Sequence, residues 1–81
     1  MLDEQYVRQI ILSNIRKMRN QKGVTQKEAA QYLGVDRSTY NKWECNGIMN
    51  VYILYELAKY FQCHIEDLLV GAFDDAMTLK E

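Results

Sequence analysis

The sequence predicts an all-α fold, and three observations support that prediction. The 81 residues are 48% hydrophobic, contain no proline and have four glycines that lie between segments of helical periodicity. Within those segments, hydrophobic residues recur at spacings of three and four, the period of an amphipathic helix. Such a chain favours helices joined by short connections. We expect one domain over residues 1–70, near the smallest size that folds without disulfides or metals, followed by a tail over residues 71–81.

The first predicted helix spans about residues 4–21. Its hydrophobic face has spacings of four, four and three residues, at Val7, Ile11, Ile15 and Met18. This pattern predicts that one side of the helix is buried and the other faces solvent.

The second and third predicted helices, about residues 26–33 and 37–45, are joined by one turn at Gly34. Thr25 and Glu28 have the spacing of a capping box, in which each side chain bonds the backbone N–H of the other residue. Gly34 suits the left-handed conformation that is common at a helix end. Asp36 is a favoured cap for the helix that follows.

The fourth predicted helix, capped by Asn50, spans about residues 51–61, and a fifth begins near residue 64 or 65. We expect the centre of the core to consist of Ala29, Ala30, Leu33, Val35, Tyr40, Trp43, Leu54 and Leu57. Trp43 lies at helical spacing from Tyr40, so we assign it to the core rather than to base stacking. Leu68 and Leu69 of the fifth helix would complete the core.

Residues 25–44, Thr-Gln-Lys-Glu-Ala-Ala-Gln-Tyr-Leu-Gly-Val-Asp-Arg-Ser-Thr-Tyr-Asn-Lys-Trp-Glu, resemble the helix-turn-helix of the Cro/phage-repressor type, the XRE family. Residues 15–19 with Gly23 are similar to the first helix of that family, residues 57–61 to its fourth and residues 65–69 to its fifth. The resemblance covers roughly residues 11–70. It implies a compact, lambda-repressor-like five-helix bundle. It also implies a small transcriptional regulator, a repressor, that binds double-stranded DNA sequence-specifically.

The resemblance places the third helix in the major groove, where an α-helix reads base edges. The base-contacting candidates are Arg37, Ser38, Thr39, Asn41 and Lys42. Arg37 can donate two parallel hydrogen bonds to guanine O6 and N7, and Asn41 can read adenine if its amide faces the groove. Lys42 can reach a second base or a phosphate.

Phosphate contacts position such a protein without reading sequence. Gln26 matches the family's phosphate-anchoring glutamine, and its backbone N–H begins a helix, which attracts anions. The further candidates are Lys27, Arg16, Lys22 and Asn46. The loop after the third helix lacks the family's basic residues and proline, so only Asn46 and the Gly47 amide remain candidates there. Gln62 also replaces a common glycine at the end of the fourth helix.

Arg19 and Glu44 match an arginine and a glutamate that pair inside related repressors, which implies a structural ion pair. Charge is divided unevenly along the chain. Residues 16–42 hold seven basic and two acidic side chains, a net charge of +5, and the remaining residues carry −6. A basic face on an acidic body attracts phosphate locally, and the alternative is an ordinary solvated surface.

We expect a homodimer on a palindromic operator, because one short helix reads only a few bases. The half-sites would lie about 34 Å apart, one turn of DNA. The first candidates for the dimer contact are Leu69, Val70, Phe73 and Met77. The second candidate is the start of the first helix.

The main alternative is a protein-interaction module on the same fold, such as an antitoxin, an antirepressor or an assembly partner. The acidic body and the missing basic loop favour it, whereas Arg37, Lys42 and Gln26 favour DNA. Salt dependence separates the two, since phosphate binding weakens steeply with salt.

An enzyme is not expected, because the single histidine and the scattered acids form no recognisable nucleophile–base pair. No cofactor or small-molecule substrate is implied. Cys45, Cys63 and His64 lack the paired spacing of a structural zinc site. The sequence has no apolar run of about 18 residues, the length that crosses a membrane. Its first residues do not resemble a secretion signal, so we expect a cytoplasmic protein.

Overall fold

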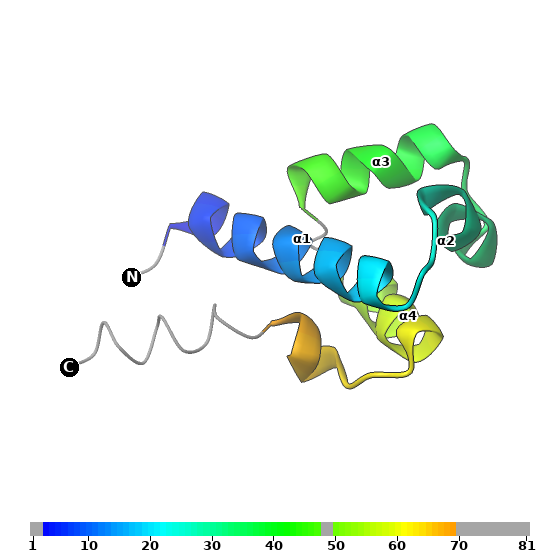
Figure 1. Cartoon of the computed structure of the whole chain (residues 1–81). Helices are drawn as coiled ribbons and strands as arrows, with labels where there is room; N and C mark the ends of the chain where they lie inside the picture. Colours follow the sequence, from blue (N-terminus) through cyan, green and yellow to red (C-terminus); the bar gives the residue numbers. More distant parts are fainter. Residues whose placement is uncertain (1–2, 48–49, 70–81) are drawn as a thin grey trace.

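The computed structural model describes residues 3–47 and 50–69, and Figure 1 shows their arrangement. Four α-helices are present in these residues: α1 (Glu4–Gln21), α2 (Gln26–Leu33), α3 (Arg37–Asn46) and α4 (Val51–Phe61). A 3-10 helix, η1 (Ile65–Leu68), follows them, and the described residues contain no strand. The long helix α1 packs against α3 and η1, while α2 packs against α3 and α4. The prediction of an all-α fold is confirmed.

The predicted fifth helix is not confirmed as an α-helix, because residues 65–68 form one 3-10 turn. Hydrogen bonds in this segment close over three residues, as from Asp67 N–H to His64 O at 2.9 Å. The carbonyl of Leu68 accepts from Asn14 Nδ2 of α1 at 3.0 Å, which ties this turn to α1. The five-helix bundle is therefore not confirmed, and the predicted tail lies outside the described residues.

The helix ends of α2 and α3 follow the predicted local chemistry. Thr25 Oγ1 accepts from Glu28 N–H at 3.1 Å, and Glu28 Oε1 accepts from Thr25 N–H at 2.9 Å, so the capping box is complete. Gly34 is left-handed, with φ of 75°. Asp36 Oδ1 accepts from Thr39 N–H at 2.7 Å and caps α3. These bonds hold the turn between the two helices in one geometry.

The end of α4 uses a left-handed residue that is not glycine. Gln62 has φ of 58°, and its N–H donates to Lys59 O at 3.2 Å. Cys63 N–H donates to Ala58 O at 2.9 Å in the same turn. The chain thus keeps the helix end for which glycine is the usual residue, at the steric cost of a side chain in this conformation.

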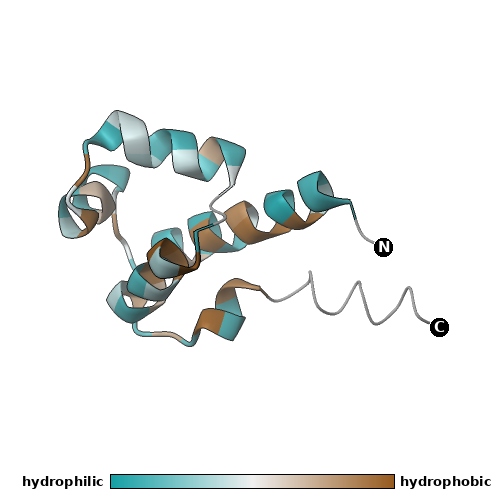
Figure 2. Cartoon of the chain, turned by 180° about the vertical axis from the view of Figure 1, so that it is seen from behind, coloured by the Kyte–Doolittle hydropathy of each residue, from teal (hydrophilic) through white to brown (hydrophobic). Residues whose placement is uncertain are grey.

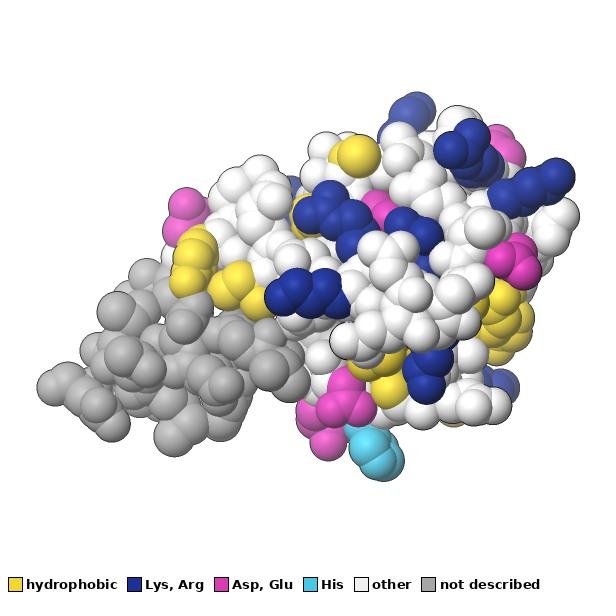
Figure 3. Space-filling view, in the orientation of Figure 1, with side chains coloured by type: hydrophobic (Ala, Val, Ile, Leu, Met, Phe, Trp, Pro, Cys, Tyr) yellow, Lys and Arg dark blue, Asp and Glu magenta, His cyan; other side chains and the backbone are white. Residues whose placement is uncertain are grey.

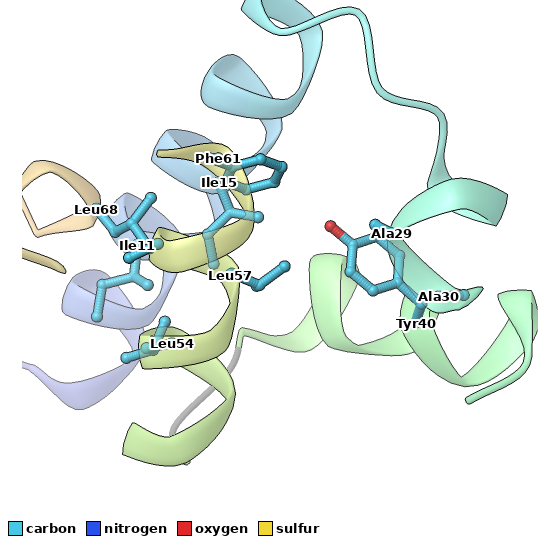
Figure 4. Packing of buried hydrophobic residues seen from close by; sticks show 10 residues of the cluster. Ile11, Ile15, Ala29, Ala30, Tyr40, Leu54, Leu57, Phe61 and Leu68 are labelled. Atoms are coloured by element: carbon cyan, nitrogen blue, oxygen red, sulfur yellow. The ribbon is translucent and has the colours of Figure 1, made fainter. Parts of the chain in front are cut away.

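The core lies between the helices and is one cluster of buried residues, whose labelled members come from α1 to α4 and η1 (Figure 4). Ile11, Ile15, Leu54, Leu57, Phe61 and Leu68 lie between α1, α4 and η1. Tyr40 of α3 lies beside Ala29 and Ala30 of α2, whose small side chains let the two helices approach closely. Stacked rings of Tyr32 and Tyr60, 4.3 Å between centroids, add a contact between α2 and α4.

Three residues expected at the centre of the core lie at its edge. Leu33, Val35 and Trp43 are only partly buried and pack against the cluster from outside. The inner face of α3 is centred on Tyr40 and on Glu44, one turn later, so Trp43 is rotated toward solvent. The rings of Trp43 and Tyr40 pack edge to face, with 6.4 Å between their centroids. Cys63 is also partly buried against the core, and burial raises the pKa of its thiol.

Within the part of the chain that the structure describes, no helix combines the length and the apolar character needed to cross a membrane.

Candidate nucleic-acid interface

Of the four α-helices that the structure describes, α3 is the most polar. Figure 2 shows α3 as largely hydrophilic, whereas brown, hydrophobic residues appear on α1, α2, α4 and η1. Of the candidate base-contacting residues, Arg37, Ser38, Asn41 and Lys42 are exposed and Thr39 is half-buried. The structure therefore presents four of the five on the surface of one helix.

An open hollow of about 400 Å³ lies on the start of α3 and is lined by Arg37, Ser38 and Asn41. Arg37 makes no hydrogen bond or ion pair with any residue in ranges 3–47 and 50–69, so all its donors are available. Ser38 Oγ donates to Asp36 Oδ1 at 2.9 Å and retains its acceptor capacity. The hollow thus offers an unpaired guanidinium beside two smaller polar groups.

A second hollow, of about 620 Å³, lies where the end of α1 meets the starts of α2 and α3. Its lining includes Asn20, Thr25, Gln26, Lys27 and Arg37. The first backbone N–H groups of a helix have no acceptor within the helix and attract anions. Those of α2 open here, beside the cations of Lys27 and Arg37, so this hollow suits a phosphate. Arg37 lines both hollows and connects the hollow at the start of α2 to the exposed start of α3.

Arg19 and Glu44 form a two-point ion pair that joins α1 to α3. Arg19 Nε donates to Glu44 Oε2 at 2.7 Å and Nη2 donates to Oε1 at 3.2 Å, while Nη1 donates to Val24 O at 3.0 Å. The Glu44 residue is 1% exposed. Burial alone would raise the pKa of its carboxyl, but hydrogen bonds, led by that from Arg19, outweigh burial and lower the pKa. The carboxylate is therefore ionised and acts only as an acceptor.

Gln26 connects this ion pair to the exposed face of α3. Its Nε2 donates to Glu44 Oε1 at 3.1 Å and to Asn41 Oδ1 at 3.1 Å. Both side-chain donors of Gln26 are then in use, and its remaining Oε1 cannot donate to a phosphate. Within this arrangement, the backbone N–H at the start of α2 is the phosphate donor that Gln26 can offer.

Of the other candidate phosphate contacts, only Lys27 lines one of the two hollows, and Lys22 lies close enough to Cys63, after α4, to oppose the rise that burial causes in the pKa of its thiol. Lys27, Arg16 and Lys22 are exposed and form no ion pair within the described residues, and Asn46 is exposed at the last residue of α3. The Gly47 amide is not available, because its N–H donates to Trp43 O at 2.9 Å. Our prediction for that amide was wrong, since it closes the end of α3.

The charge distribution follows the division seen in the sequence. Figure 3 shows most of the Lys and Arg side chains over the upper and middle part of the surface, where Figure 1 places α1, α2 and α3. A group of acidic side chains lies at the lower edge, beside the histidine. Asn20 is the lining residue that sequence reasoning missed, because only the path of the loop after α1 brings it beside the start of α2.

Two short helices joined at a left-handed glycine, with the second helix polar and exposed, define a helix-turn-helix domain. A family model described as helix-turn-helix, HTH_3, matches residues 15–68. The chain belongs to this family, which is of the XRE/Cro-like type, and the resemblance noted from sequence is confirmed. Comparisons with curated proteins and with solved structures give no match. Family membership indicates a DNA-binding regulatory domain, a class that is not typically enzymatic.

Proposed function

We propose that this protein is a sequence-specific transcriptional regulator, a repressor, that inserts α3 into the major groove of double-stranded DNA. The observation that carries the proposal is the position of Arg37, exposed, unpaired within the described residues and shared by the two hollows. A guanidinium there can donate to guanine O6 and N7 while a phosphate occupies the start of α2. Helix-turn-helix proteins dock in this manner, with the first residues of the second helix against the bases.

The remaining contacts divide by where each side chain lies. Ser38, Asn41 and Lys42 would reach base edges or adjacent phosphates, and Thr39, which is half-buried, would contribute least. The phosphate contacts would come from the backbone of Gln26 and from Lys27, Arg16, Lys22 and Asn46. Such contacts orient the domain and supply most of its salt-dependent affinity.

We further propose that two copies bind one palindromic operator. Residues 1–70 would be the DNA-binding domain, and residues 71–81 would contribute to dimerisation together with Leu69, which is half-buried at the end of the described chain. Two α3 helices related by a two-fold axis would enter successive major grooves about 34 Å apart.

The test is selection from a random duplex library at moderate salt, with the wild-type chain and an Arg37→Ala/Lys42→Ala variant. We expect the wild type to enrich a two-fold-symmetric site and the variant to lose it. Lys59→Ala is the matched control, because Lys59 is an exposed cation on α4 rather than on α3. Enrichment of the same site by the double variant, or no enrichment by the wild type, would contradict the groove-reading proposal.

One observation favours the second candidate function, a protein-interaction module. The start of α4 exposes three large side chains, with Val51 70%, Tyr52 65% and Tyr55 55% exposed. Exposed apolar and aromatic side chains grouped on one helix are typical of protein contact surfaces. Binding through these residues would show weak salt dependence and would be lost in Tyr52→Ala but kept in Arg37→Ala/Lys42→Ala.

A further inference from the structure

The two amide side chains on the DNA-facing side are held by a chain of hydrogen bonds that begins in the core. The Arg19 guanidinium has only donors, so both Glu44 oxygens that face it are acceptors. Arg19 Nε lies 2.7 Å from Glu44 Oε2, and Nη2 lies 3.2 Å from Oε1. An ionised carboxylate has no donor, and the Gln26 atom beside Glu44 Oε1 is therefore the amide nitrogen. Each residue in the chain determines which atom its neighbour can present.

The next step reaches the surface of α3. The second N–H of Gln26 Nε2 points to Asn41 at 3.1 Å, so the atom of Asn41 that faces Gln26 is the carbonyl oxygen, Oδ1. The Asn41 amide nitrogen is then directed away from Gln26, on an exposed residue that lines the hollow with Arg37 and Ser38. A free asparagine amide can rotate by half a turn and exchange its donor for its acceptor. This one cannot do so without facing two donors toward each other.

We infer that Asn41 is a specificity residue that donates from Nδ2 to a base acceptor and rejects cytosine, and that Gln26 is the positioning residue that enforces this. The inference rests on the proposed function, because it concerns how α3 reads a base. In the major groove, purine N7, guanine O6 and thymine O4 accept hydrogen bonds, whereas cytosine presents the N4 amino donor. An outward Nδ2 can therefore contact guanine, adenine or thymine at the facing position, and it meets a second donor at cytosine.

The first part of the test locates the base pair that Asn41 reads. The operator selected by the wild-type chain is re-selected with Asn41→Ala, and we expect one pair in each half-site to lose its preference while the others keep theirs. The affinities of the wild type are then measured for all four bases at that pair. Cytosine on the facing strand should bind about fivefold or more weakly than the best base, the lower end of the range for a base contact. Unchanged selection by Asn41→Ala, or a wild-type preference for cytosine, would overturn the inference.

The second part tests Gln26 through the ratio of the affinity for the best base to the affinity for cytosine at this pair. A general loss of binding or stability does not change that ratio. With Gln26→Ala the Asn41 amide is released and can turn its oxygen outward to accept from cytosine N4. We expect the fold loss of affinity on placing cytosine at this pair, the cytosine penalty, to decrease at least threefold. Lys27→Ala is the control, because Lys27 is the next residue after Gln26 and takes no part in the hydrogen bonds that hold Asn41. This variant should weaken binding to the operators with each of the four bases by the same factor. A cytosine penalty that is the same in Gln26→Ala and the wild type would overturn the positioning role.

A third variant reverses the chemistry at the surface. Asn41→Asp keeps an oxygen for Gln26 but replaces the outward donor by an acceptor, so cytosine should become the preferred base at this pair. The outcomes separate the two proposals. A wild-type chain that enriches no duplex contradicts both the function and the inference, whereas an enriched operator with base ratios unaffected by these variants contradicts the assignment of Asn41 and Gln26 alone.

Discussion

The side chain of Arg8 in α1 occupies the space beside Gly47, the residue that follows α3. A Cβ atom on residue 47 would overlap Arg8 Cγ and would lie 2.6 Å from Arg8 Cδ. Gly47 also has φ of 86° and ψ of 143°, close to a region that essentially only glycine adopts, and a residue with a Cβ would be strained there by about 1–3 kcal/mol. The end of α3 is therefore closed by the first half of α1, outside the span that the family model matches.

Gly47→Ala should lower the free energy of unfolding by about 2–4 kcal/mol, from backbone strain together with overpacking against Arg8. In Arg8→Ala/Gly47→Ala the overlap disappears and only the strain remains. We therefore expect the double variant to be less destabilised than the two single variants added together, as measured by urea denaturation. Strictly additive effects would show that Arg8 does not occupy this space.

Glu44→Gln should destabilise the domain by about 2–4 kcal/mol, because Arg19 loses a buried, two-point partner. The matched control is Glu4→Gln, the same substitution in the exposed pair between Glu4 and Arg8, at 3.2 Å. Exposed pairs contribute less than about 1 kcal/mol, so this variant should unfold close to the wild type. Equal losses in the two variants would contradict a specific contribution from Glu44.

Protonation of Glu44 should contribute to the loss of folding stability at low pH. Its pKa is lower in the folded protein than the ordinary value of 4.5, so the unfolded state binds the proton first. The stabilisation is therefore complete above about pH 4.5 and is lost as the pH falls through the folded pKa. Thermal unfolding between pH 7 and pH 3 should show a smaller decline in Glu44→Gln than in the wild type. Parallel declines would mean that other carboxylates govern acid unfolding.

Gln62→Gly should stabilise the domain by about 0.5–1 kcal/mol, or roughly 3–6 °C in Tm. Glycine removes the steric cost of φ at 58°, and part of that gain is offset by the greater entropy of the unfolded chain. Gln62→Ala retains a Cβ and should give no gain. Calorimetry on the three chains tests the assignment, and it fails if alanine stabilises as much as glycine.

Lys27→Ala should reduce the salt dependence of DNA binding as well as the affinity. If Lys27 contacts a phosphate at the start of α2, the slope of log affinity against log salt concentration should become shallower by about one unit. Titration of the selected operator at several salt concentrations measures the slope. An affinity loss with an unchanged slope would place Lys27 away from the phosphates.

The helix ends were predictable because their chemistry is local. Thr25 with Glu28, Gly34 and Asp36 act over three or four residues, and each forms the expected cap. The family resemblance was also readable, since it rests on the order of such segments. The unconfirmed fifth helix shows where this reasoning stops. Leu68 O accepts a hydrogen bond from Asn14, 54 residues earlier in the chain, and no local pattern contains that contact.

The candidate site shows the same limit. Hydrophobic periodicity assigned Trp43 to the inner face of α3, which is centred on Tyr40 and Glu44. The pairing of Glu44 with Arg19 was implied by the family resemblance and not by periodicity, and the structure contains that pair. The bond from Gln26 to Asn41 spans 15 residues and depends on the angle between α2 and α3. The polar residue types on the exposed face of α3 were predictable, while the donors left free on each side chain were not. The DNA contacts themselves stay predictions.

The link from Arg19 to Glu44 also determines whether the proposed DNA-reading surface can be transplanted. Residues 25–46 contain both helices of the motif and every side chain on the exposed face of α3, yet the cation that neutralises Glu44 lies in α1. A graft of these residues into another scaffold would carry the Glu44 carboxylate buried and unpaired. The hydrogen bonds from Gln26 to Glu44 and to Asn41 would then lack the Arg19 contact that holds Glu44 in place. The smallest portable unit of this protein therefore includes α1, and swapping specificity between relatives calls for exchanging side chains on α3 rather than the motif as a block.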